Sequence, residues 1–355
     1  MAQPTTGIIL RGKTYHIDKQ YLGQRIRGSA KTSDYDEALE VLALEMKKVR
    51  QANLFGVRQA RTFRQAATHY LNTKVKRSLA DDAMHLKLLD PYIGNLTIDR
   101  VYDETLQPFI AARRATAKKA KTINRSLEVV RHILYLCAAS WRDDGLTWLI
   151  QAPKITMLKI DDASEPYPLT WQQQRALFRE LPKNLANMAL FKVNTGAREQ
   201  EVCQLQWDWE YEIPGATVFM LPGHLTKNGK PRPLVLNRVA ANVIQAQRGI
   251  DKNFVFIGNR GTPLQKMNNN PWRQAWKRAG LPVNDKYKRG VHNLRHTFGQ
   301  RLRAAGVSEE DRAVLLGHTN KSLTTHYSAP EIYYMIDQAN KVCDERKEVI
   351  LRKVS

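Results

Sequence analysis

The 355-residue sequence is poor in cysteine. It contains only Cys137, Cys203 and Cys343, which lie far apart, each in a helical or apolar setting. This spacing excludes a disulfide framework and predicts buried thiols in a reducing compartment. A signal peptide and an apolar run of membrane length are also missing. We therefore expect a cytoplasmic protein without a membrane partner.

Acidic residues are scarce as well. There are 34 Asp and Glu residues against 56 Lys and Arg residues, which gives a formal net charge of +22, and the excess is spread along the chain. A hydrophobic content of 43% with 25% charged residues excludes a disordered chain. Distributed positive charge predicts several modules that each contact a polyanion such as double-stranded DNA. A soluble basic protein without such a partner is the simpler alternative.

A cluster of polar residues that can act on a phosphate lies near the C-terminal end. His292 and Arg295 are three residues apart, so they share one face of a predicted helix. A second predicted helix ends at Gly317, which places His318 just past its end, where free carbonyls favour a protonated imidazole. Tyr327 follows nine residues later and is a candidate nucleophile. Together these residues suggest phosphodiester chemistry.

Arg198 stands in the segment Thr195-Gly196-Ala197-Arg198, between apolar runs that predict two core helices. An unpaired charge in such a setting is costly. We therefore expect Arg198 to bind an anion and Glu201, three residues later, to orient it.

These motifs resemble those of the tyrosine recombinases of the phage integrase family. The similarity covers residues 165–330 and includes Thr195-Gly196-Ala197-Arg198, His292-Asn293-Leu294-Arg295-His296, Leu316-Gly317-His318 and Tyr327, in the family's order. The resemblance assigns catalytic roles to Arg198, Lys227, His292, Arg295 and His318, with Tyr327 as the nucleophile and Glu201 in support. Lys227 is preferred over Lys230 because it comes just before a predicted Asn228-Gly229 hairpin turn.

The resemblance also implies an activity. It indicates a site-specific recombinase that forms a 3′-phosphotyrosyl intermediate, needs no metal, ATP or other cofactor, and integrates or excises a phage or mobile element. It further implies a homotetramer on DNA that acts through a Holliday junction in the nucleoid of a bacterial cell. A DNA-bending accessory protein and an excisionase are the additional expected partners.

The expected fold is mainly α with small β-sheets (α+β) in a multidomain arrangement. Residues 1–58 are predicted to form a domain of three short strands and one helix that resembles an arm-type DNA-binding domain. Residues 62–160 predict a helical core-binding domain, and residues 165–355 predict the catalytic domain. The stretch 161–168 is interpreted as a linker. A C-terminal helix after Tyr327 has no evident partner in its own chain, and the resemblance implies that it packs on a neighbouring protomer.

The residues expected to contact DNA are basic side chains from each domain. Solvated charges are the alternative for all of them, and a capping hairpin is the alternative for the first domain. They are Arg25, Arg27, Arg113, Arg114, Lys118, Lys119, Lys121, Arg125, Lys286, Lys288 and Arg289.

Four other functions fit parts of this pattern. A zinc site could use His292, His296, His318 and His326, but it would place Arg295 beside a cation and has no cysteine or carboxylate at ligand spacing. A type IB topoisomerase uses similar groups, and a non-catalytic DNA-binding regulator would not need Tyr327. An Xer-like chromosome-dimer resolvase is the nearest alternative, and the predicted domain at 1–58 argues against it.

Overall fold

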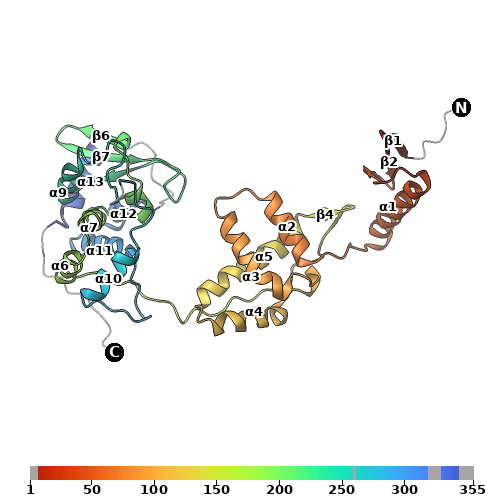
Figure 1. The fold of residues 1–355 in the computed structure, drawn as a ribbon, viewed down its shortest axis with the longest axis horizontal. Helices are drawn as coiled ribbons and strands as arrows, with labels where there is room; N and C mark the ends of the chain where they lie inside the picture. Colours follow the sequence, from red (N-terminus) through yellow and green to blue (C-terminus); the bar gives the residue numbers. More distant parts are fainter. Residues whose placement is uncertain (1–6, 259–260, 319–328, 344–355) are drawn as a thin grey trace. The chain divides into compact units, whose positions relative to one another are not determined.

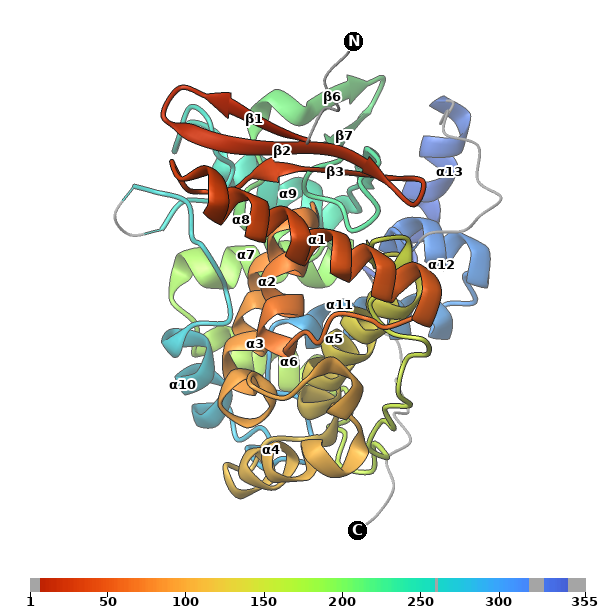
Figure 2. The ribbon, with the colours of Figure 1, turned by 90° about the vertical axis from the view of Figure 1, so that its right-hand side faces the viewer.

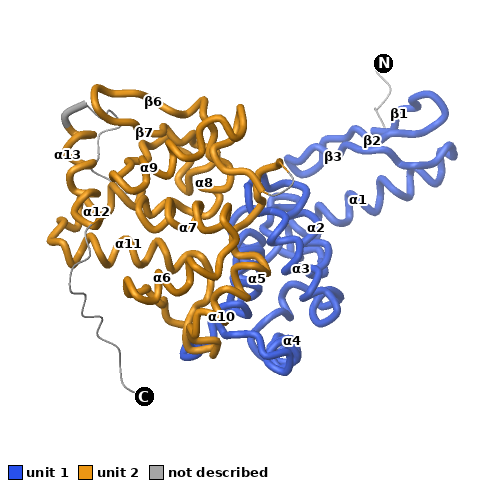
Figure 3. The backbone as a smooth tube through the Cα atoms, turned by 60° about the vertical axis from the view of Figure 1, so that its left-hand side comes forward, with its two compact units in different colours: residues 1–163 blue, residues 164–355 orange. Residues whose placement is uncertain are grey.

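A computed structural model describes residues 7–258, 261–318 and 329–343 (Figure 1). The fold is mainly α-helical with small antiparallel sheets, as the sequence predicted. The chain divides into two compact units, residues 1–163 and 164–355 (Figure 3). The finer division of the first unit near residues 58–62 stays a prediction.

The first unit begins with a three-stranded antiparallel sheet and one long helix. The sheet is β1 (Ile8–Arg11), β2 (Thr14–Tyr21) and β3 (Gln24–Ser29), followed by α1 (Tyr35–Phe55). Asp34 caps α1 by accepting hydrogen bonds from the backbone of Asp36 and Glu37. The helix covers one face of the sheet, where Ile17 is buried (Figure 2). The opposite face stays open.

The rest of the first unit is a helical bundle. Its elements are α2 (Phe63–Thr73), α3 (Leu79–Ile93), the short 3-10 helix η1 (Ile98–Arg100), α4 (Asp103–Ala115) and α5 (Ala120–Ala139). Helix α5 is its centre because Leu127, Val130 and Leu134 pack into the core with Phe63 and Phe109.

The prediction that residues 62–159 are helical was wrong after α5, because residues 140–159 contain no helix. Strands β4 (Arg142–Asp143) and β5 (Leu146–Thr147) form a small hairpin there. Its turn residues Asp144 and Gly145 have φ of 48° and 85°, which is the left-handed conformation that a tight hairpin turn requires. The Asp-Gly pair was the local signal for this turn.

The second unit is built from helices around one small sheet. Its helices are α6 (Trp171–Arg179), α7 (Lys183–Thr195), α8 (Glu199–Cys203), η2 (Trp207–Trp209), α9 (Arg238–Gln247), α10 (Asn270–Arg278), α11 (His292–Ala304), α12 (Glu309–Leu316) and α13 (Ala329–Asn340). The antiparallel sheet is β6 (Glu210–Ile213), β7 (Ala216–Leu221) and β8 (Arg232–Val235).

Helix α7 lies at the centre of this unit. It packs against α9 on one side and α11 on the other, and Met188, Phe191 and Val193 are fully buried. Thr170 caps α6 in a reciprocal pair with Gln173, as expected of a helix that opens at Thr170. The packing of α7 on α11 brings the two predicted arginine motifs to one place.

Residues 164–168 belong to the second unit, so the predicted linker was too long. Glu165 exchanges backbone hydrogen bonds with the strand-like segment at Lys286 and Lys288, and Tyr167 is buried. The side chain of Asn293 accepts a hydrogen bond from the backbone N–H of Tyr167 at 2.9 Å. Prolines and acids made this stretch resemble a linker, but contacts with α11 fix it.

The predicted C-terminal helix also has a partner in its own chain. On α13, Ala339 is buried against Val235, Phe298 and Leu302, and Asn340 accepts a hydrogen bond from the backbone of Arg238 at 2.8 Å. The expectation that this helix lacks an internal partner was therefore wrong. Its apolar face fits the groove between β8, α11 and α12.

Two smaller expectations concern cysteine and membranes. Cys137 and Cys203 are buried, and burial raises the pKa of each thiol to about 12. Cys343 is only half-buried, so the expectation of three buried thiols was wrong for one. Among the helices of the described ranges, none combines the length and apolar character that a bilayer crossing requires.

Candidate active site

The site forms where the turn between α7 and α8 meets the ends of α11 and α12. Arg198 precedes α8, and its backbone N–H donates to Glu201 Oε2 at 2.6 Å. Its guanidinium donates to Glu201 Oε1 at 2.9 Å and to the Gly317 carbonyl at 2.8 Å. The side chain is 23% exposed, so it is not fully enclosed.

Glu201 is fully buried and contacts two arginines. Besides Arg198, it accepts a hydrogen bond from Arg232 on β8 at 2.8 Å. Burial alone would raise the pKa of Glu201, but Arg232 and Arg198 outweigh burial and lower it. The carboxylate is therefore charged and orients Arg198, as the sequence predicted.

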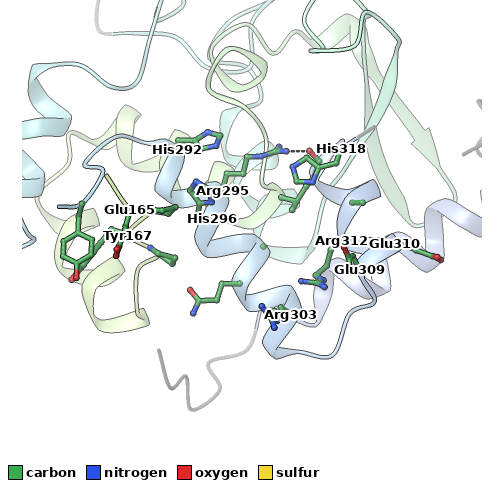
Figure 4. Close-up of a pocket in the computed structure, with 17 residues that line it drawn as sticks. Glu165, Tyr167, His292, Arg295, His296, Arg303, Glu309, Glu310, Arg312 and His318 are labelled. Carbon is green, nitrogen blue, oxygen red and sulfur yellow. Dashed lines mark hydrogen bonds between the residues drawn. The ribbon is translucent and has the colours of Figure 1, made fainter. Parts of the chain in front are cut away.

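Arg295 reaches the same place from α11. It is buried, donates to the Gly196 carbonyl at 2.7 Å and also donates to the Leu316 carbonyl (Figure 4). Burial, Arg198 and Arg232 lower the pKa of Arg295 to about 9. Burial and two neighbouring arginines both disfavour the charged guanidinium, and an anion bound beside it would favour the charged form.

Gly196 permits this close approach. Its φ is 65°, and a Cβ there would lie 2.6 Å from the ring of Phe298 and 2.8 Å from Leu316. Only glycine combines the left-handed backbone with this contact. The turn before Arg198 can therefore pack directly on α11 and α12.

His292 and His296 lie one turn apart on α11, with ring centroids 4.8 Å apart. The side chains of both point into a cavity of about 1000 Å³ that Arg295 and His318 also line (Figure 4). Burial, His296, Lys192, Arg295 and Lys288 together lower the pKa of His292 to about 4. Its ring is neutral at pH 7 and can accept a proton.

His318 follows the left-handed cap Gly317, and its backbone N–H donates to Ala313 at 2.8 Å. The expectation that helix carbonyls would keep this ring protonated was wrong. Burial and the charges of Arg295, Arg198 and Arg232 lower its pKa, with a further contribution from Lys227. The nearby cations outweigh the helix end, because full charges act more strongly than partial ones.

Lys227 is exposed in the connection between β7 and β8. This connection is the loop 222–231, closed by hydrogen bonds of the Thr226 hydroxyl to the carbonyls of Gly223 and Lys230. The predicted two-residue turn at Asn228-Gly229 was therefore wrong, although Gly229 has a φ of 73°. Because Lys227 lowers the pKa of His318, its charge lies within electrostatic range of the site.

Tyr327 and His326 lie outside the described residues. The role of Tyr327 and the histidine set of the zinc alternative therefore stay predictions.

The basic residues predicted to contact DNA lie at three places. Arg25 and Arg27 project from the open face of the first sheet, where Asp18 accepts two hydrogen bonds from Arg25 at 2.7 and 2.9 Å. Lys286, Lys288 and Arg289 are exposed on the segment just before α11.

The third place is the connection from α4 to α5. Arg114, Lys118, Lys121 and Arg125 are exposed there, while Arg113 and Lys119 are half-buried. Asp162 accepts hydrogen bonds from Arg114 at 2.9 Å and from the backbone of Ala120 at 2.7 Å. On α5, Arg125 lies 3.6 Å from the buried carboxylate of Asp82. These contacts hold two of the basic side chains on one surface.

Comparison with known proteins agrees with this geometry. Residues 169–332 match the sequence model of the Phage integrase family. Tyrosine recombinase XerD of Yersinia pestis is 26% identical over 277 residues, which cover 72% of this chain and 88% of XerD. Residues 169–332 are a domain of the phage integrase family, the tyrosine recombinases.

Solved structures show that the recombinase fold extends over the whole chain. A lambda integrase dimer bound to a COC′ core site matches with a TM-score of 0.58 and 14% identity, covering 99% of this chain and 98% of that one. A lambda integrase tetramer bound to a Holliday junction matches with a TM-score of 0.57 and 13% identity, covering 91% and 98%.

Sequence reasoning missed two cations of this recombinase site. Arg232 lies on β8 and Lys192 lies inside α7, and both are buried close to Glu201 or Arg295. The available signal was a basic residue inside a run that otherwise predicts a core strand or helix. Lys192 lies only three residues before the Thr195-Gly196-Ala197-Arg198 motif, but its place beside Arg295 depends on tertiary packing, as does the place of Arg232.

We expect Glu201→Gln to destabilise the second unit of the recombinase by roughly 3 kcal/mol, because two buried or half-buried arginines lose their counter-charge. Thermal unfolding of the full chain would measure this change. The control is Glu310→Gln, which removes the same charge from an exposed position on α12. Equal melting temperatures for the two variants would show that Glu201 does not anchor the site.

We expect His292 to titrate far below an ordinary histidine, with a pKa of about 4. Its folded pKa is lowered, so the neutral ring persists as the pH falls through 6.5 and protonates only near 4. NMR titration of the histidine ring signals would measure this value, and His292→Asn would assign the signal. A His292 signal that titrates at or above pH 6.5 would contradict the burial argument.

Proposed function

We propose that this recombinase is an integrase that cleaves and rejoins double-stranded DNA through a 3′-phosphotyrosyl intermediate on Tyr327. The observation that supports this best is the convergence of Arg198 and Arg295 at one cationic site beside a neutral His292. Planar guanidinium groups suit two oxygens of one phosphate. Burial and the charges of Arg198 and Arg232 lower the pKa of Arg295, and a bound phosphate would offset the repulsion between these cations.

The proposed cleavage is an in-line displacement at phosphorus. The Tyr327 hydroxyl oxygen attacks the scissile phosphate, and His292 accepts the phenolic proton. Arg198 and Arg295 bind the two non-bridging oxygens, where negative charge builds up, and His318 donates a hydrogen bond to the same phosphate. A neutral imidazole can donate from one ring nitrogen, so the lowered pKa of His318 is compatible with this role.

The leaving group is the 5′ oxygen of the next nucleotide. Its bond to phosphorus breaks as the phosphotyrosyl bond forms, and Lys227 supplies the proton that yields a 5′ hydroxyl. The new linkage keeps the free energy of the broken one, so rejoining to another strand requires neither ATP nor a metal. Attack of a 5′ hydroxyl on the phosphotyrosyl group reverses each step.

The proposed assembly is a homotetramer that exchanges strands through a Holliday junction. The match to the lambda integrase tetramer on such a junction supports this state. We also propose that the basic places on both units bind the DNA flanking the cleavage point. A DNA-bending protein and an excisionase are proposed partners, and the cytoplasm of a bacterial cell, on the nucleoid, is the proposed location.

Integration or excision of a mobile element is favoured over chromosome-dimer resolution. Among structural matches, lambda integrase covers 99% of this chain, whereas the XerH recombinase bound to difH covers 81%. This chain also has the front sheet, with Arg25 and Arg27 on its open face. A second DNA-binding module of this kind fits a protein that binds additional sites beside the cleavage point.

We expect wild-type protein to form a covalent adduct with DNA and Tyr327→Phe to form none, since the phenylalanine ring has no oxygen to attack phosphorus. Each protein would be incubated with DNA of the source organism and washed under denaturing conditions, and the protein-linked ends would be sequenced. Tyr334→Phe is the matched control, because this half-exposed tyrosine on α13 loses only a hydrogen bond to Asp311.

The positions of the linked ends separate the remaining functions. Ends at a few sites that border a mobile element support an integrase, and ends at one chromosomal site support a resolvase. Scattered ends without a shared sequence would favour a topoisomerase. Retention of adducts by Tyr327→Phe would overturn the assignment of the nucleophile.

We expect the double variant Lys118→Ala, Lys121→Ala to bind DNA more weakly and with less dependence on salt. Each lost phosphate contact lowers the slope of log affinity against log salt by about 0.9. Fluorescence anisotropy between low and moderate salt would measure the slope. Lys87→Ala is the control, because Lys87 is exposed on α3, outside the α4–α5 connection. An unchanged slope would mean that these two lysines do not contact phosphates.

A further inference from the structure

Lys192 is the one lysine that sits in the core beneath the catalytic arginines among the residues the structure describes. It is 0% exposed on α7, between the buried side chains of Phe191 and Val193. Burial of an ammonium group opposes folding strongly unless other groups compensate. An apolar residue of the same length would pack there at lower cost, so packing does not account for a lysine.

The contacts of Lys192 lie at the turn that carries Arg198. Its ammonium group donates to the carbonyl of Ala197, and the preceding carbonyl, of Gly196, accepts from Arg295 at 2.7 Å. Two successive carbonyls at the end of α7 therefore each bind a cation, one from α7 itself and one from α11. Arg198 follows directly, so Lys192 constrains the backbone that sets its position.

The charges that face Lys192 come from two neighbouring helices. On α11, Arg295 disfavours its protonation, while Glu201, Glu199 and Cys203 on α8 favour it. Burial is the strongest influence, and together these groups lower the pKa of Lys192 to about 7. A phosphate on Arg295 and Arg198 would favour the charged form.

Lys192 acts on His292 in turn. The groups that lower the pKa of His292, after burial, are His296, Lys192, Arg295 and Lys288. A charged Lys192 thus disfavours protonation of the ring that must accept the tyrosine proton.

We propose that Lys192 is a positioning residue of the recombinase site: it fixes the turn before Arg198 and supplies a buried positive charge that keeps the ring of His292 neutral before the reaction. This role rests on the proposed function, because it concerns the same phosphate and the same base.

The test compares Lys192→Met, which keeps the length and removes the charge, with Lys183→Met, which makes the same change at an exposed position on α7. Adduct formation would be timed from pH 5 to pH 9 on the DNA that wild type captures. We expect Lys192→Met to cleave about tenfold more slowly or worse at pH 7. We also expect the acidic limb of its pH profile to move to higher pH, because the pKa of His292 rises when the neighbouring charge is removed.

The outcomes separate this inference from the proposed function. If wild type forms no adduct, the proposed function fails. If wild type and Lys192→Met have the same rate and the same pH profile, Lys192 is not a positioning residue. If Lys192→Met cleaves more slowly but its pH profile is unchanged, Lys192 fixes the turn before Arg198 but has no effect on the protonation of His292, and that part of the proposal is overturned.

A second measurement covers the case in which Lys192→Met does not fold. The side-chain NMR signals of isotope-labelled lysine in wild type would be titrated with and without inorganic phosphate. We expect one lysine to titrate near neutral pH, and phosphate to move its titration upward. If every lysine signal titrates in the ordinary range near pH 10, the inference is overturned.

Discussion

The ion pairs of one buried carboxylate hold the active site together. Glu201 binds Arg198, which directly precedes α8, and Arg232 from β8, and so connects the sheet to the turn that begins the site. A buried charge with two cationic partners is costly to disrupt, because each lost contact leaves a charge without compensation. Such a pairing fixes geometry more than it adds stability, and a phosphate site requires fixed geometry.

The cations outnumber the buried acids around this carboxylate. Arg198, Arg232, Arg295 and Lys192 surround Glu201. Burial is the main cause of the lowered pKa values of Arg295 and Lys192, and neighbouring cations lower them further. By linkage, an anion that raises the pKa values of Arg295 and Lys192 binds more tightly to the site when these groups are protonated than when they are neutral. The free site therefore contains cations that repel one another, and a bound anion would offset this repulsion.

Local patterns predicted the elements of the site, and long-range packing explains most of the misses. The spacing of His292 and Arg295 predicted one helical face correctly, because a helical period needs no tertiary information. The roles of Lys192 and Arg232 in the site, and the surface on which α13 packs, depend on which elements contact each other. No local sequence pattern contains that information. The hairpin at Asp144-Gly145 is different, since its turn signal was present and overlooked. The protonation of His318 was misjudged because its neighbours come from three distant segments.

The close contact at Gly196 shows that a position can be sensitive to substitution without taking part in the chemistry. Any side chain there would meet Phe298 and Leu316 and push α11 away from the turn. A survey of substitutions that scored only activity would rank this glycine with the arginines, although it has no group that could bind a proton or an anion. Variation among related chains would be restricted there for a steric reason, so an invariant position in this site is not by itself evidence of a catalytic role.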